Sequence, residues 1–262
     1  MKIHLITYGD GDVKFSNSAE RLAKQARLTS WFETIEIWDL CKLKEFDFIW
    51  AKNHSDFINN NKRGHGYWIW KPKTILSKLK MMPENDILIY VDSGCEINNN
   101  GHEKLLQYAK WASYSGMVAF YLNGPNYTIA QWTKRNLLEY FGVHQNQDLL
   151  KYPQVEAGVL VLKNNLETRN FISTWLDISL KENYLYINDA IKGGLEEPNF
   201  IEHRHDQAIF SLLHYTTQFG ISVRNENYFP ELWINNMHPH FSPIAAFRNL
   251  TPNSKMETMS FF

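Results

Sequence analysis

The most constraining feature of the sequence is an unbroken apolar run, Ile87-Leu88-Ile89-Tyr90-Val91, that ends in Asp92. Five residues is the usual length of a strand, and a run without polar alternation predicts a strand that is buried on both faces. Such strands lie at the centre of parallel sheets that are covered by helices on both sides. The run therefore predicts an α/β fold with this strand near the middle of the sheet.

The rest of the chain alternates between strand-like and helix-like patterns, as such a sheet requires. Strands are predicted at 3–8, 35–38, 117–122, 154–162 and 221–223, and helices at 16–26, 46–58, 72–82, 103–114, 128–138, 165–178 and 205–214. Ser16 is expected to cap the first helix, and 225–262 is expected to be a loop-rich C-terminal segment. We expect residues 1–262 to form a single domain with a mostly parallel, Rossmann-like central sheet and helices on both faces.

Charge and composition limit the class of protein. The net charge is −1, so no broad basic face is available and a nucleic-acid partner is not expected. The N-terminus has no signal-peptide pattern, the apolar runs are far shorter than a membrane span, and the two cysteines form no framework. These features favour a cytoplasmic protein and leave peripheral contact with the inner membrane possible.

Polar residues collect where the predicted strands end, which is where ligands bind in folds of this class. Asp92-Ser93-Gly94 follows the central strand. A carboxylate at this position can bind a divalent metal, accept hydrogen bonds from ribose hydroxyls, or cap the turn that follows the strand. The segment 63–72 combines Arg63 and Lys71 with glycines and aromatic residues ahead of a helix. Cations and a helix N-terminus favour phosphate, glycines let a backbone approach a ligand, and aromatic rings stack on bases or sugars.

Three further acid or histidine positions suggest a site. Glu156 is a single acid in an otherwise apolar predicted strand, where an unpaired carboxylate is costly. The segment 202–207 places Asp206 and Gln207 at a predicted helix start, where the acid also suits simple capping. His240 belongs to a His-Pro-His sequence, a weak metal-binding pattern.

Several enzyme classes lack their defining residues. The segment after the first predicted strand has no third glycine of a dinucleotide-binding fingerprint, and the chain has no phosphate-binding loop with Gly-Lys-Ser/Thr. It also has no Gly-x-Ser-x-Gly elbow and no Cys-x-x-Cys zinc pattern. Dehydrogenase, kinase and serine-hydrolase functions are therefore not supported.

The ordered set of these segments resembles GT-A type glycosyltransferases of bacterial and viral surface-polysaccharide and lipopolysaccharide loci, and more loosely glycosyltransferase families 8 and 32. The resemblance covers about residues 3–240. The segments that carry it are Leu5-Ile6-Thr7-Tyr8, Gly66-Tyr67-Trp68-Ile69-Trp70-Lys71-Pro72, Ile89-Tyr90-Val91-Asp92-Ser93-Gly94, Glu156-Ala157-Gly158-Val159 and His205-Asp206-Gln207. It implies a GT-A fold and transfer of a sugar, of hexosyltransferase type, from a nucleotide-diphosphate sugar to a glycan or lipid-linked acceptor.

The resemblance also implies roles for individual residues. The donor-binding residues would be Thr7, Tyr8, Trp70, Lys71, Asp92, Ser93, Gly94 and Gly158. Glu156, Asp206 and Gln207 would be the catalytic set beside the transferred sugar and the acceptor. Asp92 would hold Mn²⁺ or Mg²⁺ as the first acid of an Asp-x-Asp motif, and His240 would complete the metal site.

The sequence departs from that motif in one place, because Gly94 stands where the second carboxylate is expected. Glu96 is a candidate substitute, and Asp92 with His240 alone is another. In a metal-independent enzyme, Lys71 or Arg63 would instead neutralise the diphosphate. The sequence does not decide between these, nor between a retaining and an inverting reaction.

Two alternative functions stay open at this point. A nucleotidyltransferase shares the fold but needs a glycine- and Arg/Lys-rich loop after the first strand, and Gly9-Asp10-Gly11-Asp12 is acidic. The missing second acid leaves open a non-catalytic module that binds a nucleotide-sugar. Detectable nucleotide-sugar hydrolysis distinguishes an active enzyme from this module.

Overall fold

The computed structural model describes residues 1–122, 124–190, 195–217, 219–224 and 242–255. Its main sheet has the strand order β2-β1-β3-β6-β5-β7. The strands are β1 (Ile3–Tyr8), β2 (Thr34–Trp38), β3 (Ile87–Val91), β5 (Met117–Phe120), β6 (Val159–Lys163) and β7 (Ile221–Arg224). Only β6 runs against its neighbours among these six, so the prediction of a mostly parallel sheet is confirmed.

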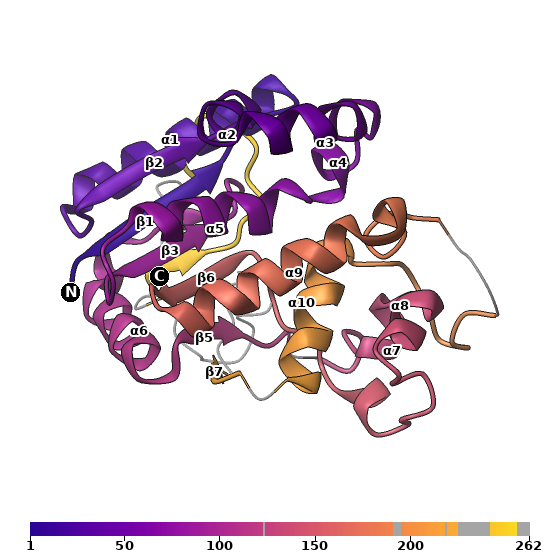
Figure 1. Ribbon diagram of the computed structural model, residues 1–262. Helices are drawn as coiled ribbons and strands as arrows, with labels where there is room; N and C mark the ends of the chain where they lie inside the picture. The colour runs from indigo at the N-terminus through magenta and orange to yellow at the C-terminus, as the bar shows by residue number, and fades with distance from the viewer. Residues whose placement is uncertain (123, 191–194, 218, 225–241, 256–262) are drawn as a thin grey trace.

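Helices cover both faces of this sheet (Figure 1). The helices are α1 (Val13–Thr29), α2 (Leu40–Phe46), α3 (Phe48–Asn60), α4 (Gly64–Tyr67), α5 (Trp70–Met81), α6 (His102–Ser115), α7 (Ile129–Trp132), α8 (Arg135–Tyr140), α9 (Leu166–Tyr184) and α10 (His205–Thr216), with 3-10 turns at Asn99–Gly101 and Leu149–Lys151. Helices α1 and α6 pack on one face, while α5, α9 and α10 pack on the other. No helix in the described ranges is long and apolar enough to cross a bilayer.

Strand β3 lies between β1 and β6, and all five of its residues are buried. Its side chains alternate between the two cores: Ile89 contacts the α1 and α6 side, and Tyr90 contacts the α5 and α9 side. The central position that the apolar run predicts is therefore confirmed, because only a strand between two helical layers buries every side chain.

Four local predictions need correction. Helix α1 begins earlier than expected, because Asp12 rather than Ser16 accepts the capping hydrogen bond, from Lys14 N. The single helix predicted at 46–58 is two helices, separated at Asp47. The helix predicted at 128–138 is also two helices, α7 and α8, separated at Thr133 and Lys134.

The fourth correction concerns the strand predicted at 154–162. Strand β6 starts only at Val159, and Val155 makes an isolated bridge to Tyr121 instead. Glu156 therefore precedes the strand and is not inside it. The Glu156 N–H still donates to the carbonyl of Phe120 at 2.8 Å, which holds this stretch against the end of β5.

The C-terminal segment 242–255 packs across the turn that follows β3. Its strand β8 (Ile244–Ala245, yellow in Figure 1) pairs with β4 (Glu96–Ile97). The buried guanidinium of Arg21 donates to the carbonyls of Ser93 and Cys95 on one side and of Asn249 and Thr251 on the other, at 2.7–2.9 Å. The Arg21 side chain of α1 thus links the C-terminal segment to the turn that follows β3.

We expect Arg21→Met to lower the free energy of unfolding by about 3 kcal/mol, because four largely buried carbonyls lose a charged donor. Urea unfolding followed by circular dichroism measures this change. Arg27→Met, at an exposed position of the same helix, is the matched control and should change stability by less than about 0.5 kcal/mol. Equal stabilities of the two variants would contradict the role assigned to Arg21.

Candidate active site

A cavity of about 440 Å³ opens at the edge of the sheet where β1 and β3 end. Because β6 is antiparallel to β3, the residues that precede β6 reach the same edge as the residues that follow β3. The cavity brings together most of the predicted site residues: Tyr8, Trp70, Lys71, Asp92, Ser93, Gly94, Glu156, Gly158, Asp206 and Gln207.

Two predicted site residues are not in this group. Thr7 is fully buried and does not line the cavity. Consecutive side chains of a strand point to opposite faces of the sheet, and the side chain on the face of the cavity is that of Tyr8. His240 lies outside the described residues, so the predicted contribution of this histidine to a metal site has no structural description here.

The centre of the site is a buried ammonium between two carboxylates. Lys71 Nζ, on the first turn of α5, lies 2.7 Å from Asp206 Oδ2 and 3.2 Å from Asp92 Oδ1. The side chains of Lys71 and Asp206 are 4% and 7% exposed, whereas that of Asp92 is 40% exposed. Asp92 is therefore the member of this trio that faces the cavity most openly.

Burial and charge act in opposite directions on these groups. Burial raises the pKa of Asp206 to about 6, although the Lys71 ammonium opposes the rise and Asp92 adds to it. Burial by itself would lower the pKa of Lys71, but the carboxylates of Asp206 and Asp92 outweigh it and raise that pKa. At neutral pH the site thus holds a charged lysine and an ionised Asp206 that gains a proton in mild acid.

Asp92 is fixed in place from two sides. Its Oδ1 accepts a 2.6 Å hydrogen bond from the Tyr90 hydroxyl, and its N–H donates to the Gly158 carbonyl at 2.8 Å. A Cβ at position 158 would lie 3.0 Å from Asp92 Oδ2. The absence of a side chain at Gly158 therefore lets the start of β6 approach the carboxylate closely.

An aromatic wall closes one side of the cavity. The rings of Tyr8 and Trp70 stack with centroids 3.7 Å apart, and Trp70 Nε1 donates to the Gly64 carbonyl. The expectation that the glycines here serve a ligand's approach needs correction for Gly66. It has a positive φ, and a Cβ there would lie 2.8 Å from Ile58 Cα, so its small size serves packing against α3.

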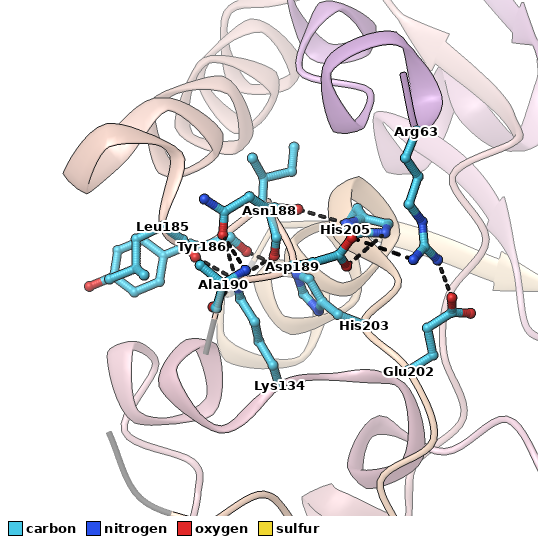
Figure 2. Close-up of polar contacts among 11 residues, drawn as sticks. Arg63, Lys134, Leu185, Tyr186, Asn188, Asp189, Ala190, Glu202, His203 and His205 are labelled. Carbon is cyan, nitrogen blue, oxygen red and sulfur yellow. Dashed lines mark hydrogen bonds and ion pairs between the residues drawn. The ribbon is translucent and has the colours of Figure 1, made fainter. Parts of the chain in front are cut away.

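Arg63 lies at the rim of the cavity and is already paired (Figure 2). Its guanidinium contacts the carboxylates of both Asp189 and Glu202. Asp189 also lies 3.7 Å from the ring of His205, whose Nδ1 donates to the Ile187 carbonyl. Arg63 therefore contributes little uncompensated positive charge to a ligand.

The segment that carries Asp189 is held from below by Lys134 (Figure 2). This lysine is 1% exposed, and its ammonium donates to the carbonyls of Leu185, Asn188 and Ala190. Burial lowers the pKa of Lys134 to about 8, with Asp189 and Glu196 offsetting part of the effect. It is thus mostly charged at neutral pH and shapes the wall of the cavity without lining it.

The described residues contain only part of the metal site that the resemblance implies, because His240 lies outside them. Among them, no three His, Cys, Asp or Glu side chains come together to hold an ion. Glu96, the proposed substitute for the second acid, is fully buried and does not line the cavity. Its carboxylate instead accepts hydrogen bonds from Asn249, Ser254 and Lys255 N, so it holds the C-terminal segment.

Sequence reasoning missed two arginines that line the cavity, Arg204 and Arg248. Arg204 lies inside the segment 202–207 that the sequence analysis singled out, so the polar character of that segment was a usable signal. Arg248 belongs to an aperiodic segment with no motif, so nothing in the local sequence marks it.

No family model and no curated protein sequence matches this chain. Among solved structures, the apo form of mouse xyloside xylosyltransferase 1 matches with a TM-score of 0.50 and 11% identity, over 94% of this chain and 97% of that one. The galactosyltransferase LgtC, in complex with donor and acceptor sugar analogs, matches with a TM-score of 0.43 and 15% identity, over 94% and 83%. A glycosyltransferase involved in glycosylation of the PBCV-1 major capsid matches with a TM-score of 0.40 and 9% identity, over 78% and 81%.

At such low identities a structural match shows a shared fold. The match to the xylosyltransferase extends over nearly the whole of both chains. The fold of this protein is that of the GT-A glycosyltransferases, as the sequence predicts.

We expect the Asp206 carboxyl to titrate with a pKa of about 6, against an ordinary value of 3.8, and to titrate higher still in Lys71→Met. The folded state then binds more protons than the unfolded state between about pH 4 and 6, so this group's contribution to stability falls as the pH rises through that window. Carboxyl ¹³C NMR, with the resonance assigned through Asp206→Asn, measures both values. A wild-type value near 3.8 would show that burial does not control this group, and a lower value in Lys71→Met would show that the ammonium does not oppose the rise.

We expect Lys134→Met to lower the free energy of unfolding by about 3 kcal/mol, because the carbonyls of the 185–190 segment lose their donor. The melting temperature should fall by roughly 6–12 °C. Lys151→Met, at a side chain that is 75% exposed, provides the control in a calorimetric comparison. If both variants melt together, Lys134 does not hold the segment.

Proposed function

We propose that the cavity binds a nucleotide-diphosphate sugar and that the protein transfers the sugar, as a hexosyltransferase, to a glycan or lipid-linked acceptor. The observation that carries this proposal is the convergence of Asp92, Glu156 and Asp206 with Lys71 in one cavity at the ligand edge of a GT-A sheet. Polysaccharide or lipopolysaccharide biosynthesis, in the cytoplasm with possible peripheral membrane contact, is the setting that the sequence predicts for this activity.

The reaction assigns different tasks to the acids. The acceptor hydroxyl oxygen forms a bond to the anomeric carbon, the bond from that carbon to the phosphate oxygen breaks, and the nucleoside diphosphate leaves with the electron pair. The hydroxyl proton passes to a carboxylate in an inverting reaction, for which Glu156 and Asp206 are the candidates. Asp206 is held by Lys71 and titrates near pH 6, so it is ionised and basic at neutral pH.

The remaining walls support donor binding. The stacked pair Tyr8 and Trp70 presents an aromatic surface, and aromatic rings complement nucleobases and sugar rings. Ser93 and Gly94 follow Asp92 directly and place backbone groups beside it. Gln207 adds an amide at the start of α10, beside Asp206.

A nucleotidyltransferase is less well supported. Asp10 lines the cavity and accepts hydrogen bonds from the Leu40 N–H and the Tyr8 hydroxyl. Asp12 caps α1. The loop after β1 therefore presents acids where a triphosphate would need cations.

We expect Asp206→Asn and Asp92→Asn each to lower transfer by at least about 100-fold, because an amide neither accepts a proton nor carries the charge of the site. In the wild-type enzyme, transfer should fall below about pH 6 as Asp206 gains a proton. Sugar release from a panel of UDP-, GDP-, CMP- and dTDP-sugars, with and without acceptor, provides the measurement.

Asp56→Asn, at an exposed position of α3, is the matched control and should keep full activity. Thermal melting of each variant separates lost chemistry from lost folding. Undiminished turnover in folded Asp206→Asn would exclude its catalytic role. Binding of a nucleotide-sugar without any release across the panel would instead support a non-catalytic module.

A further inference from the structure

We infer that the ring of Tyr127 is the binding surface for the acceptor, and that the acceptor presents a neutral sugar ring to it. This inference rests on the proposed function, because it concerns the acceptor end of the same cavity. It separates a glycan acceptor from a bare lipid phosphate, which has no ring to stack on an aromatic side chain.

The strand order β1-β3-β6-β5 sets the order of side chains along the cavity (Figure 1). Tyr8 is the last residue of β1, and Asp92 follows β3. Glu156 precedes β6, and Tyr127 belongs to the loop after β5. Since neighbouring strands lie about 4.8 Å apart, about 14 Å separates β1 from β5. The acids Asp92 and Glu156 therefore lie between an aromatic wall at one end and Tyr127 at the other.

The two ends of the cavity suit the two substrates of a transfer reaction. The stacked rings of Tyr8 and Trp70 form the surface that we propose for the donor. A donor bound there extends its diphosphate and sugar along the cavity toward Asp92 and Glu156. The acceptor hydroxyl must reach the same acids from the end that the donor leaves free, and that end is lined by Tyr127.

Buried polar contacts hold Tyr127 at this end. The N–H of Gln154, a fully buried residue, donates to the Tyr127 carbonyl at 2.7 Å. The side chain of Gln154 donates to the Thr133 hydroxyl and accepts from the Ser211 hydroxyl, each at 3.0 Å. Glu156 follows Gln154 by two residues, so one short segment fixes the backbone of Tyr127 and carries a candidate base for the acceptor hydroxyl.

The ring of Tyr127 is also supported by its neighbours. The Trp132 ring lies nearly parallel to it, with centroids 6.1 Å apart and an interplanar angle of 19°. The Arg204 guanidinium lies 4.1 Å from the Trp132 centroid, and Trp132 Nε1 donates to the Asn126 carbonyl at 2.6 Å. The described residues that line the cavity include Tyr127 and do not include Trp132. Trp132 therefore backs the Tyr127 ring, which faces the cavity as a surface for another ring.

Charges of both signs surround this end of the cavity. Burial and the positive charges of Arg248 and Arg63 lower the pKa of Arg204, and the Glu202 carboxylate opposes them. Glu156 adds an acid to the same part of the cavity. Sugar hydroxyls donate to carboxylates and accept from guanidinium groups, while the C–H face of a sugar ring packs on an aromatic ring. A neutral sugar therefore matches this surface better than an anion or a cation does.

Transfer assays on the full chain test this inference, with the nucleotide-sugar that the wild type uses as donor. The acceptors are the methyl glycosides of glucose, galactose, mannose and xylose, and polyprenyl phosphate. Tyr127→Ala should raise the KM for the preferred glycoside about 10-fold and leave the KM for the donor within about twofold, because only the acceptor loses a stacked ring. Tyr127→Phe should match the wild type, and Tyr127→Leu should resemble Tyr127→Ala. Tyr114→Ala, at a residue that is 80% exposed on α6, is the matched control and should change neither KM.

The other outcomes separate this inference from the proposed function. An unchanged acceptor KM in folded Tyr127→Ala would overturn the inference and leave the proposed function intact. Equal rises in the KM for donor and for acceptor would show a structural effect of the loop and would overturn it as well. Sugar release that polyprenyl phosphate accelerates and no glycoside does would also overturn it. No sugar release from any donor, with or without acceptor, would refute the proposed function, and the inference with it.

Discussion

The structure of the site depends on the buried ammonium of Lys71. It joins three parts of the chain that are far apart in sequence: the first turn of α5, the end of β3 through Asp92, and the start of α10 through Asp206. Removing either carboxylate would leave a buried charge poorly compensated, which is among the most costly changes in a protein interior. The two carboxylates differ in exposure: that of Asp206 is enclosed, whereas that of Asp92 is open to the cavity.

The direction of β6 is the second constraint. In an all-parallel sheet, residues that precede a strand lie at the edge opposite to the ligand site. Because β6 is antiparallel to both β3 and β5, Glu156 and Gly158 enter the site ahead of the strand. Gly158 packs against Asp92. The antiparallel direction of β6 therefore brings Glu156 and a close backbone contact to the same cavity.

The C-terminal segment shows how buried polar groups fix a surface element. Arg21 and Glu96 are both buried, and each forms hydrogen bonds with the backbone or side chains of 249–255. Such satisfied networks specify one arrangement, since a displaced segment would leave charged groups without partners. Glu96, four residues after Asp92, therefore has a structural role, whereas the residues just before it line the cavity.

The sequence by itself determined the fold class, the central position of β3 and the polar segments that meet at the ligand edge. Those are local properties: five consecutive apolar residues, helical periodicity, and acids placed at strand and helix ends. The sequence did not determine that β6 is antiparallel to its neighbours or that Thr7 points away from the cavity. It also did not determine that Glu96 is buried or that Arg204 and Arg248 line the site. Tertiary structure alone decided these four features, because each depends on which distant segment packs against the residue. The local sequence pattern does not identify that segment.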